Sequence, residues 1–177
     1  MRRHLAIIGI LTLALGPALA LDLPTRKAGL WELTMTFEGR NTPPQVMKQC
    51  TDASTDKLMN LNFGGSNEMA CSKHDVTNTG GGYVIDAVCT FGEMTTTSHS
   101  VVSGSFDSAY KIETTSTRKG GPQLPGVTPG TPTRMTIEAK WLGACAAGQK
   151  PGDVTMANGM TMNVLDIQKM RPPTAPK

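Results

Sequence analysis

The chain has 177 residues, of which 38% are hydrophobic, 18% are charged and only 5% are aromatic. This length supports one domain with its own core, and the composition excludes both a bundle of membrane-spanning helices and a long disordered tail. The formal net charge of +3 falls by two, to +1, without Arg2 and Arg3, which lie in a segment that we expect to be removed. A chain so close to neutral has no field that favours nucleic acid or an anionic membrane as its partner.

Residues 1–20 have the three-part pattern of a secretory signal peptide. A basic start is followed by an apolar stretch from Leu5 to Leu15, a Gly16-Pro17 break and small residues before position 21. The apolar stretch is too short to cross about 30 Å of hydrocarbon. We therefore expect cleavage after Ala20 and an exported protein without a transmembrane segment.

Apolar and polar residues alternate through most of the chain after residue 30. A period of two is typical of strands with one buried face and one wet face. The alternation predicts seven strands, at residues 31–38, 45–50, 68–78, 83–91, 94–102, 106–117 and 133–142. Short turns join most of them, which indicates a mainly β fold, an antiparallel meander that forms a small barrel or a strongly curled sheet.

Three segments depart from this alternation. Residues 51–59 predict one short helix, with Thr51 or Asp52 as its N-cap. The segment 117–132 contains four glycines and four prolines, so it predicts a long loop rather than a strand. Near the C-terminus, residues 165–170 predict a final helical turn before a frayed end.

Four cysteines, Cys50, Cys71, Cys89 and Cys145, in an exported chain predict two disulfides. Zinc binding is disfavoured because the spacing contains no Cys-x-x-Cys pair. A glycine run marks a hairpin between Cys71 and Cys89, and a three-residue loop at 79–81 would place these two cysteines opposite each other. That register favours Cys71–Cys89 and leaves Cys50 for Cys145, although spacing alone permits three pairings.

A second hairpin is marked by Asn158-Gly159. A three-residue turn with Gly159 in the left-handed conformation would collect four apolar side chains on one face: Val154, Met156, Met160 and Met162. The chain is rich in methionine, with 11 in total. The thioethers of Met156, Met160 and Met162 could bind Cu(I) or Ag(I), or these side chains could fill the core.

Candidate catalytic residues are sparse. Beyond the signal segment the histidines are His74 and His99, and neither lies in a metal-binding or nucleophile motif. The sequence contains no Gly-x-Ser-x-Gly, no His-Glu-x-x-His and no phosphate-binding glycine loop before a helix. The carboxylates are scattered over faces that we expect to be wet. The sequence therefore indicates a protein that is not an enzyme and that uses no cofactor.

Two short segments carry a resemblance to a known family. Residues 28–32 (AGLWE) and 140–145 (KWLGAC), with a cysteine after the second strand and the Cys-hairpin-Cys unit, resemble the exported bacterial family called domain of unknown function 3617. The resemblance covers nearly all of the chain after residue 20. It implies an exported, mostly β domain, periplasmic in a Gram-negative cell, and it implies no established activity. Gly29-x-Trp31 is also similar to the first strand of lipocalin-like barrels.

These patterns divide the chain into a signal peptide at 1–20, a disulfide-stapled β domain at 21–147 and a tail at 148–177. We expect a periplasmic or extracellular binding module that holds an apolar or amphipathic ligand, with the 117–132 loop near its mouth. The expected ligand-binding residues share the inner face of the sheet: Trp31, Leu33, Met35, Phe37, Tyr83, Ile85, Phe91, Met135, Ile137 and Trp141. The same side chains could instead fill the interior. A second hypothesis is a cell-envelope module without a pocket that binds a protein through its edge strand or tail hairpin.

Overall fold

The computed structural model describes residues 23–64, 70–123 and 128–170. The predicted signal peptide and residues 171–177 lie outside the described residues. Nine strands in the described part form one antiparallel sheet in the order β3-β4-β5-β6-β7-β1-β2-β8-β9. Their bounds are β1 Gly29–Phe37, β2 Gln45–Thr51, β3 Ala70–Asn78, β4 Gly82–Phe91, β5 Met94–Ser105, β6 Ala109–Lys119, β7 Thr133–Gly143, β8 Asp153–Met156 and β9 Thr161–Asn163.

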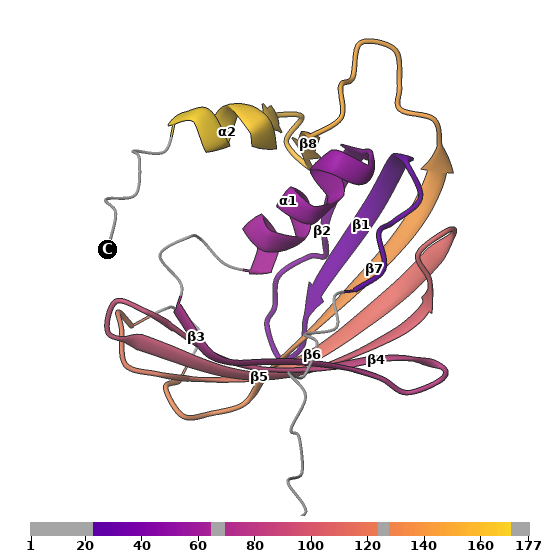
Figure 1. The fold of residues 1–177 in the computed structure, drawn as a ribbon. Helices are drawn as coiled ribbons and strands as arrows, with labels where there is room; N and C mark the ends of the chain where they lie inside the picture. The colour runs from indigo at the N-terminus through magenta and orange to yellow at the C-terminus, as the bar shows by residue number, and fades with distance from the viewer. Residues whose placement is uncertain (1–22, 65–69, 124–127, 171–177) are drawn as a thin grey trace, which may run out of the picture.

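The sheet curls strongly and does not close (Figure 1). Strands β3, β4 and β5 form its floor, and the sheet turns upward through β6, β7 and β1. The helices α1, Ala53–Gly64, and α2, Val164–Met170, lie within the curl. We call the side of the sheet that faces them the inner face and the opposite side the outer face. The predicted curled, mainly β fold is confirmed, and among the described residues neither helix is long and apolar enough to span a bilayer.

Both predicted disulfides are present, Cys50–Cys145 and Cys71–Cys89. The hairpin that joins the second pair differs from the predicted one. Asn78 pairs with Tyr83, and the Thr79 N–H donates to Gly82 O at 3.0 Å, so the turn has two residues, Gly80 and Gly81, one fewer than expected. A bulge between Cys71 and Lys73 then shifts the register by one residue and restores the Cys71–Cys89 pair. A tight turn and a compensating bulge therefore replace the predicted three-residue loop.

The tail hairpin has the predicted three-residue turn. Val154 pairs with Met162, Met156 N donates a hydrogen bond to Met160 O at 2.9 Å, and Gly159 has φ +81°. Strand β8 also pairs with β2, so the hairpin extends the same sheet. Its register follows from burying one apolar face.

Several element boundaries differ from the sequence prediction by one to five residues, and two of them matter for the sites described below. Strand β6 continues to Lys119, pairing with Thr95 on β5, because the first glycine of the long loop comes only at residue 120. Residues 124–127 of that loop lie outside the described part. The helix begins at Ala53 rather than at residue 51, because Thr51 still pairs with Gly29 in the sheet.

The core lies between the inner face and the two helices. Trp31 is completely buried, and its ring lies 5.5 Å from the ring of Tyr110, which stacks on Phe106 at 4.8 Å. Six strands and both helices contribute buried apolar side chains to this cluster: Trp31, Leu33, Met47, Met59, Val102, Tyr110, Ala139, Val154 and Val164. The core therefore joins the middle of the sheet to α1 and α2.

A buried ion pair crosses this core. Arg26 Nε lies 2.6 Å from Asp56 Oδ1, and the two side chains are 2% and 1% exposed. The Arg26 backbone N–H also donates to Asp56 Oδ2 at 3.0 Å, and its Nη1 donates to Gln49 Oε1 at 2.8 Å. The guanidinium lies 5.8 Å from the centre of the Trp31 ring. One arginine thus fastens the segment before β1 to α1, β2 and the central tryptophan.

We expect Arg26→Met to lower the free energy of unfolding by about 3–5 kcal/mol, because it removes the cation paired with a buried carboxylate. Urea unfolding followed by tryptophan fluorescence measures this change. Lys48→Met is the control, since the Lys48–Glu32 pair is exposed and 3.8 Å long, and its cost should stay below about 1 kcal/mol. If both substitutions lower the free energy of unfolding by the same amount, the buried Arg26–Asp56 pair does not have the stabilising role given to it here.

Asp52 caps the N-terminus of α1. Its Oδ1 accepts hydrogen bonds from the backbone N–H groups of Ser54 at 3.0 Å and Thr55 at 2.8 Å, and from both hydroxyls. The bond from the Thr55 N–H is the main cause that lowers the pKa of the Asp52 carboxyl below its ordinary value. The carboxylate therefore stabilises the fold above the unfolded-state pKa, near 3.8, and this contribution is lost as the pH falls through the lower folded-state pKa.

We expect Asp52→Ala to lower the free energy of unfolding by about 1 kcal/mol at neutral pH, because two N–H groups lose their acceptor. Asp52→Asn should keep most of the cap while removing its pH dependence. Urea unfolding at pH 7 and at pH 3 separates the two effects. If Asp52→Ala leaves the free energy of unfolding unchanged, the cap does not stabilise the protein.

Candidate functional site

The inner face of the sheet is the candidate site, because strand alternation gathers there most of the apolar side chains predicted to bind a ligand. Trp31 and Leu33 lie in the buried core beneath the helices, at 0% and 7% exposure. The interior is therefore filled at this end of the sheet. Five further predicted residues are partly buried and pack against that core: Met35, Tyr83, Ile85, Ile137 and Trp141.

The other three predicted residues lie outside this cluster. Phe37 lies beneath the guanidinium of Arg40, 4.8 Å from the ring centre. Met135 pairs with Phe37 across β1 and β7. Phe91 is 42% exposed near the turn between β4 and β5. The sequence pattern thus predicted that these residues share a face of the sheet, but in the structure they do not pack against the same cluster.

Farther from the helices, the inner face becomes polar along β5 and β6. Ser100 Oγ lies 2.9 Å from Thr114 Oγ1, and Ser116 Oγ lies 3.1 Å from Thr133 Oγ1. These hydroxyls are partly buried and bind one another across neighbouring strands. Their hydrogen bonds need no partner from outside the sheet.

Arg118 lies at the end of this row on β6. Its side chain is buried, at 9% exposure, and Nη1 lies 3.7 Å from the sulfur of Met94. Nε and Nη2 have no hydrogen-bond partner in the part of the chain that the structure describes. The sequence did not predict this residue as part of a site, because the predicted strand ended at Thr117 and β6 continues to Lys119. The pattern that could have predicted its position is the alternation of inward and outward residues along β6, which runs from Tyr110 to Arg118.

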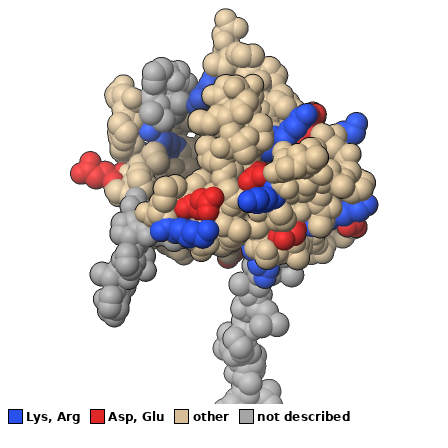
Figure 2. All heavy atoms as spheres, turned by 90° about the horizontal axis from the view of Figure 1, so that it is seen from above, with Lys and Arg blue, Asp and Glu red and all other residues tan. Residues whose placement is uncertain are grey.

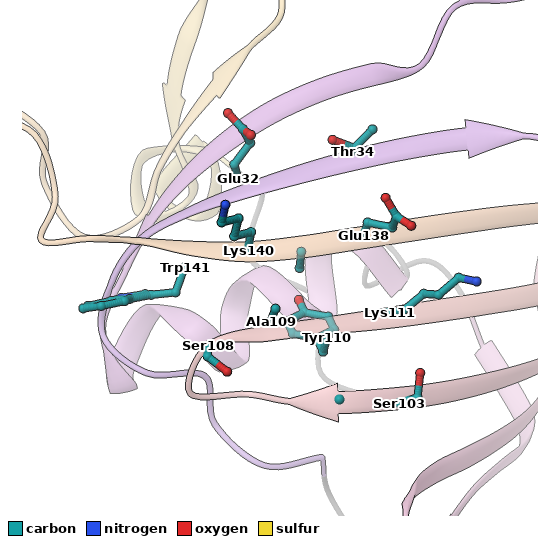
Figure 3. Close-up of a pocket in the computed structure, with 12 residues that line it drawn as sticks. Glu32, Thr34, Ser103, Ser108, Ala109, Tyr110, Lys111, Glu138, Lys140 and Trp141 are labelled. Carbon is teal, nitrogen blue, oxygen red and sulfur yellow. The ribbon is translucent and has the colours of Figure 1, made fainter.

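The outer face carries a shallow hollow of about 680 Å³. Figure 3 shows charged side chains from β1, β6 and β7 standing along it, among them Glu32, Lys140, Glu138 and Lys111. Trp141 lies at its edge, where the Lys27 ammonium lies 3.6 Å from the ring centre. Of the ten predicted ligand-binding residues, this hollow includes Trp141 alone.

Opposite charges on the outer face lie beside each other, both along β6 and across neighbouring strands. Lys111 Nζ donates to Glu113 Oε1 at 2.8 Å, and this bond is the main cause that raises the pKa of Lys111. Glu32 pairs in register with Lys140 and Lys111 with Glu138. In the view of Figure 2, basic and acidic side chains also lie interspersed rather than gathered by sign. Such a ladder is typical of a solvated face.

Asp86 and His99 form a second exposed pair on neighbouring strands. His99 Nδ1 lies 2.8 Å from Asp86 Oδ1, and this hydrogen bond is the main cause that lowers the pKa of the carboxyl. The two side chains are 42% and 56% exposed. They lie in register between β4 and β5, and the arrangement suits cross-strand pairing on a wet face.

The residues considered for metal binding do not share one environment. Met156 and Met162 pack against the core, whereas Met160 is 52% exposed. Within the described ranges, no group of three or more His, Cys, Asp or Glu side chains could hold a metal ion. Core packing accounts for two of the three methionines.

Residues 26–145 match the family model described as "Protein of unknown function (DUF3617)". The chain belongs to the DUF3617 family. A search of the curated proteins and a search of the solved structures each found no match. The DUF3617 segment begins at Arg26, ends at Cys145 and contains β1 to β7, whereas β8, β9 and α2 follow it. The predicted resemblance to this family is confirmed, and the lipocalin-like similarity gains no support. The family description names no activity, so the function proposed for this DUF3617 domain rests on its geometry.

Proposed function

We propose that this DUF3617 domain is an exported binding module that holds an apolar or amphipathic small molecule on the inner face of its sheet. The observation that carries the proposal is the uneven cover of that face. Helix α1 contacts β2, and α2 contacts β9 and α1, so both lie at the β1–β2 side of the curl (Figure 1). Partly buried apolar side chains continue beyond them on β4, β6 and β7, at Tyr83, Ile85, Ile112 and Ile137.

Export is supported by the leader pattern at 1–20 and by the two disulfides, which suit an oxidising compartment. The arrangement of the site favours binding over catalysis. The charged groups described above lie mainly on the wet outer face in cross-strand pairs, whereas the inner face offers apolar groups and paired hydroxyls. A concave sheet face with this chemistry suits a ligand that is mostly hydrocarbon.

A protein partner at the edge of the sheet is the less favoured alternative. Strand β3 forms one edge, and nearly all of its side chains are exposed. It also carries the exposed charged pair Lys73–Asp75, at 3.5 Å. Charged side chains on an edge strand hinder the addition of another strand.

The test uses the chain expressed with its leader and recovered after export. We expect native mass spectrometry to detect a bound small molecule. After bound small molecules are removed (the stripped protein), the neutral fluorescent probe N-phenyl-1-naphthylamine should bind in their place. Ile85→Asn should weaken probe binding about tenfold, because an apolar inner-face contact is replaced by an amide.

Val101→Asn is the matched control, since Val101 is 41% exposed on the adjacent strand β5 and lies in register with Val84, the outward neighbour of Ile85. Its probe affinity should stay within about twofold of the unsubstituted protein, well under the 1.4 kcal/mol that tenfold represents. Circular dichroism checks that both variants fold. Absence of probe binding, or an equal loss in both variants, would overturn the proposed function.

A further inference from the structure

Arg118 lies in a row of inner-face residues that crosses four strands. Cys71 pairs with Cys89, Cys89 with Thr96, and Thr96 with Arg118. Directly paired residues point to the same face of a sheet. Arg118 therefore points to the inner face. Its pairing partner Thr96 lies on β5, one of the strands that form the floor of the curl (Figure 1).

Arg118 is buried, and no described residue places a carboxylate against its guanidinium. The residue is 9% exposed, and among the described residues its side chain has one hydrogen-bond contact, the weak acceptor sulfur of Met94 at 3.7 Å. The neighbouring inner-face positions are Cys89, Thr96 and Ser116, none of which is acidic. A buried arginine normally has an anionic or carbonyl partner, because an unpaired charge in a low-dielectric environment is costly.

The two guanidinium atoms without a hydrogen bond limit which chemical group would fit beside them. Nε and Nη2 make no hydrogen bond to the described residues, and both lie on one edge of the planar guanidinium. That edge presents two parallel N–H groups, the geometry that binds a carboxylate through both oxygens.

Arg26 shows what a satisfied buried arginine looks like in this same chain. Its Nε lies 2.6 Å from Asp56 Oδ1, its Nη1 donates to Gln49, and its Nη2 lies 3.6 Å from the sulfur of Met59. Both arginines thus have a thioether neighbour, but Arg26 has a carboxylate on its Nε and Arg118 has none there. The two sites therefore differ in the carboxylate on Nε and in the glutamine oxygen on Nη1, both of which Arg26 has and Arg118 lacks among the described residues.

We propose that Arg118 binds the carboxylate of an amphipathic ligand whose hydrocarbon part lies along the inner face. This inference rests on the proposed function and specifies its ligand class as a long-chain monocarboxylate. Ile112 lies six residues before Arg118 on β6, which is about 20 Å of extended strand, and Ile137 pairs with Ile112 on β7. Between these two ends the hydroxyls of Thr114 and Ser116 bind those of Ser100 and Thr133, so a hydrocarbon chain that crosses them takes no hydrogen-bond partner away from these groups.

The test compares two ligands of equal length, dodecanoate and 1-dodecanol, by displacement of N-phenyl-1-naphthylamine from the exported, stripped protein. We expect Arg118→Met to weaken dodecanoate binding at least about tenfold, the loss typical of one charge-assisted bidentate pair, and to leave 1-dodecanol binding unchanged. Arg118→Lys, which keeps the charge but not the two-pronged edge, should give an intermediate loss. Arg134→Met is the control, because the Arg134 side chain is 68% exposed on β7.

The two ligands separate the two proposals. If neither ligand displaces the probe, the proposed function itself fails. If both bind and Arg118→Met weakens them equally or not at all, the hydrophobic face stands and the role of Arg118 is wrong.

The melting temperature of the ligand-free protein tests whether Arg118 has a structural role. The free Arg118→Met protein should have a melting temperature at least as high as the unsubstituted protein, because no folded-state partner of Nε or Nη2 is lost. At one concentration, dodecanoate should raise the melting temperature of the unsubstituted protein more than that of Arg118→Met. A variant that melts well below the unsubstituted protein in the absence of ligand would assign Arg118 a structural role and overturn the inference.

Discussion

The buried contact between Arg26 and Asp56 decides where the helices lie on the sheet. Asp56 is in the first turn of α1, Gln49 is on β2, and Arg26 precedes β1, so the hydrogen bonds of one guanidinium tie three segments together. Burial also raises the pKa of the Tyr110 hydroxyl beside this group, with Arg26 acting in the opposite direction. A charge buried this deeply tolerates few alternative arrangements. Helix α1 is therefore held at the β1–β2 side, whereas apolar inner-face side chains farther along the sheet, such as Ile85 on β4 and Ile112 on β6, are only partly buried.

That asymmetry gives the inner face two chemical regions. Beneath the helices it is an apolar core centred on Trp31, whereas toward the end of β6 it carries paired hydroxyls and then Arg118. The two buried arginines lie in these different regions. Arg26 completes its hydrogen bonds within the fold, and Arg118 does not do so among the described residues. Structural and functional roles of the same side-chain type can thus be separated by what each one contacts.

Local patterns in the sequence predicted much of this fold. Alternation gave the strands, the glycine run gave the hairpin that brings Cys71 to Cys89, and the turn at Gly159 gave the tail hairpin. The Arg26–Asp56 pair was not predictable, because its partners lie 30 residues apart and no periodic signal links them. Arg118 was missed for another reason: a loop rich in glycine and proline follows directly, and the strand was ended too early. The bulge after Cys71 also lay beyond reach, since a turn one residue shorter and a compensating bulge bring the same cysteines together.

The order of strands has a consequence for how the chain matures. Strands β3 to β7 follow one another in sequence and in space, whereas β1 inserts between β7 and β2, and the Cys50–Cys145 bond spans 95 residues across that junction. Synthesis delivers the amino-terminal part first, so Cys50 encounters Cys71 and Cys89 before its native partner exists. A disulfide formed at that stage between Cys50 and either Cys71 or Cys89 would trap a mispaired intermediate. Correct maturation then depends on prompt closure of the local hairpin, which removes both competing thiols and leaves Cys50 to wait for Cys145.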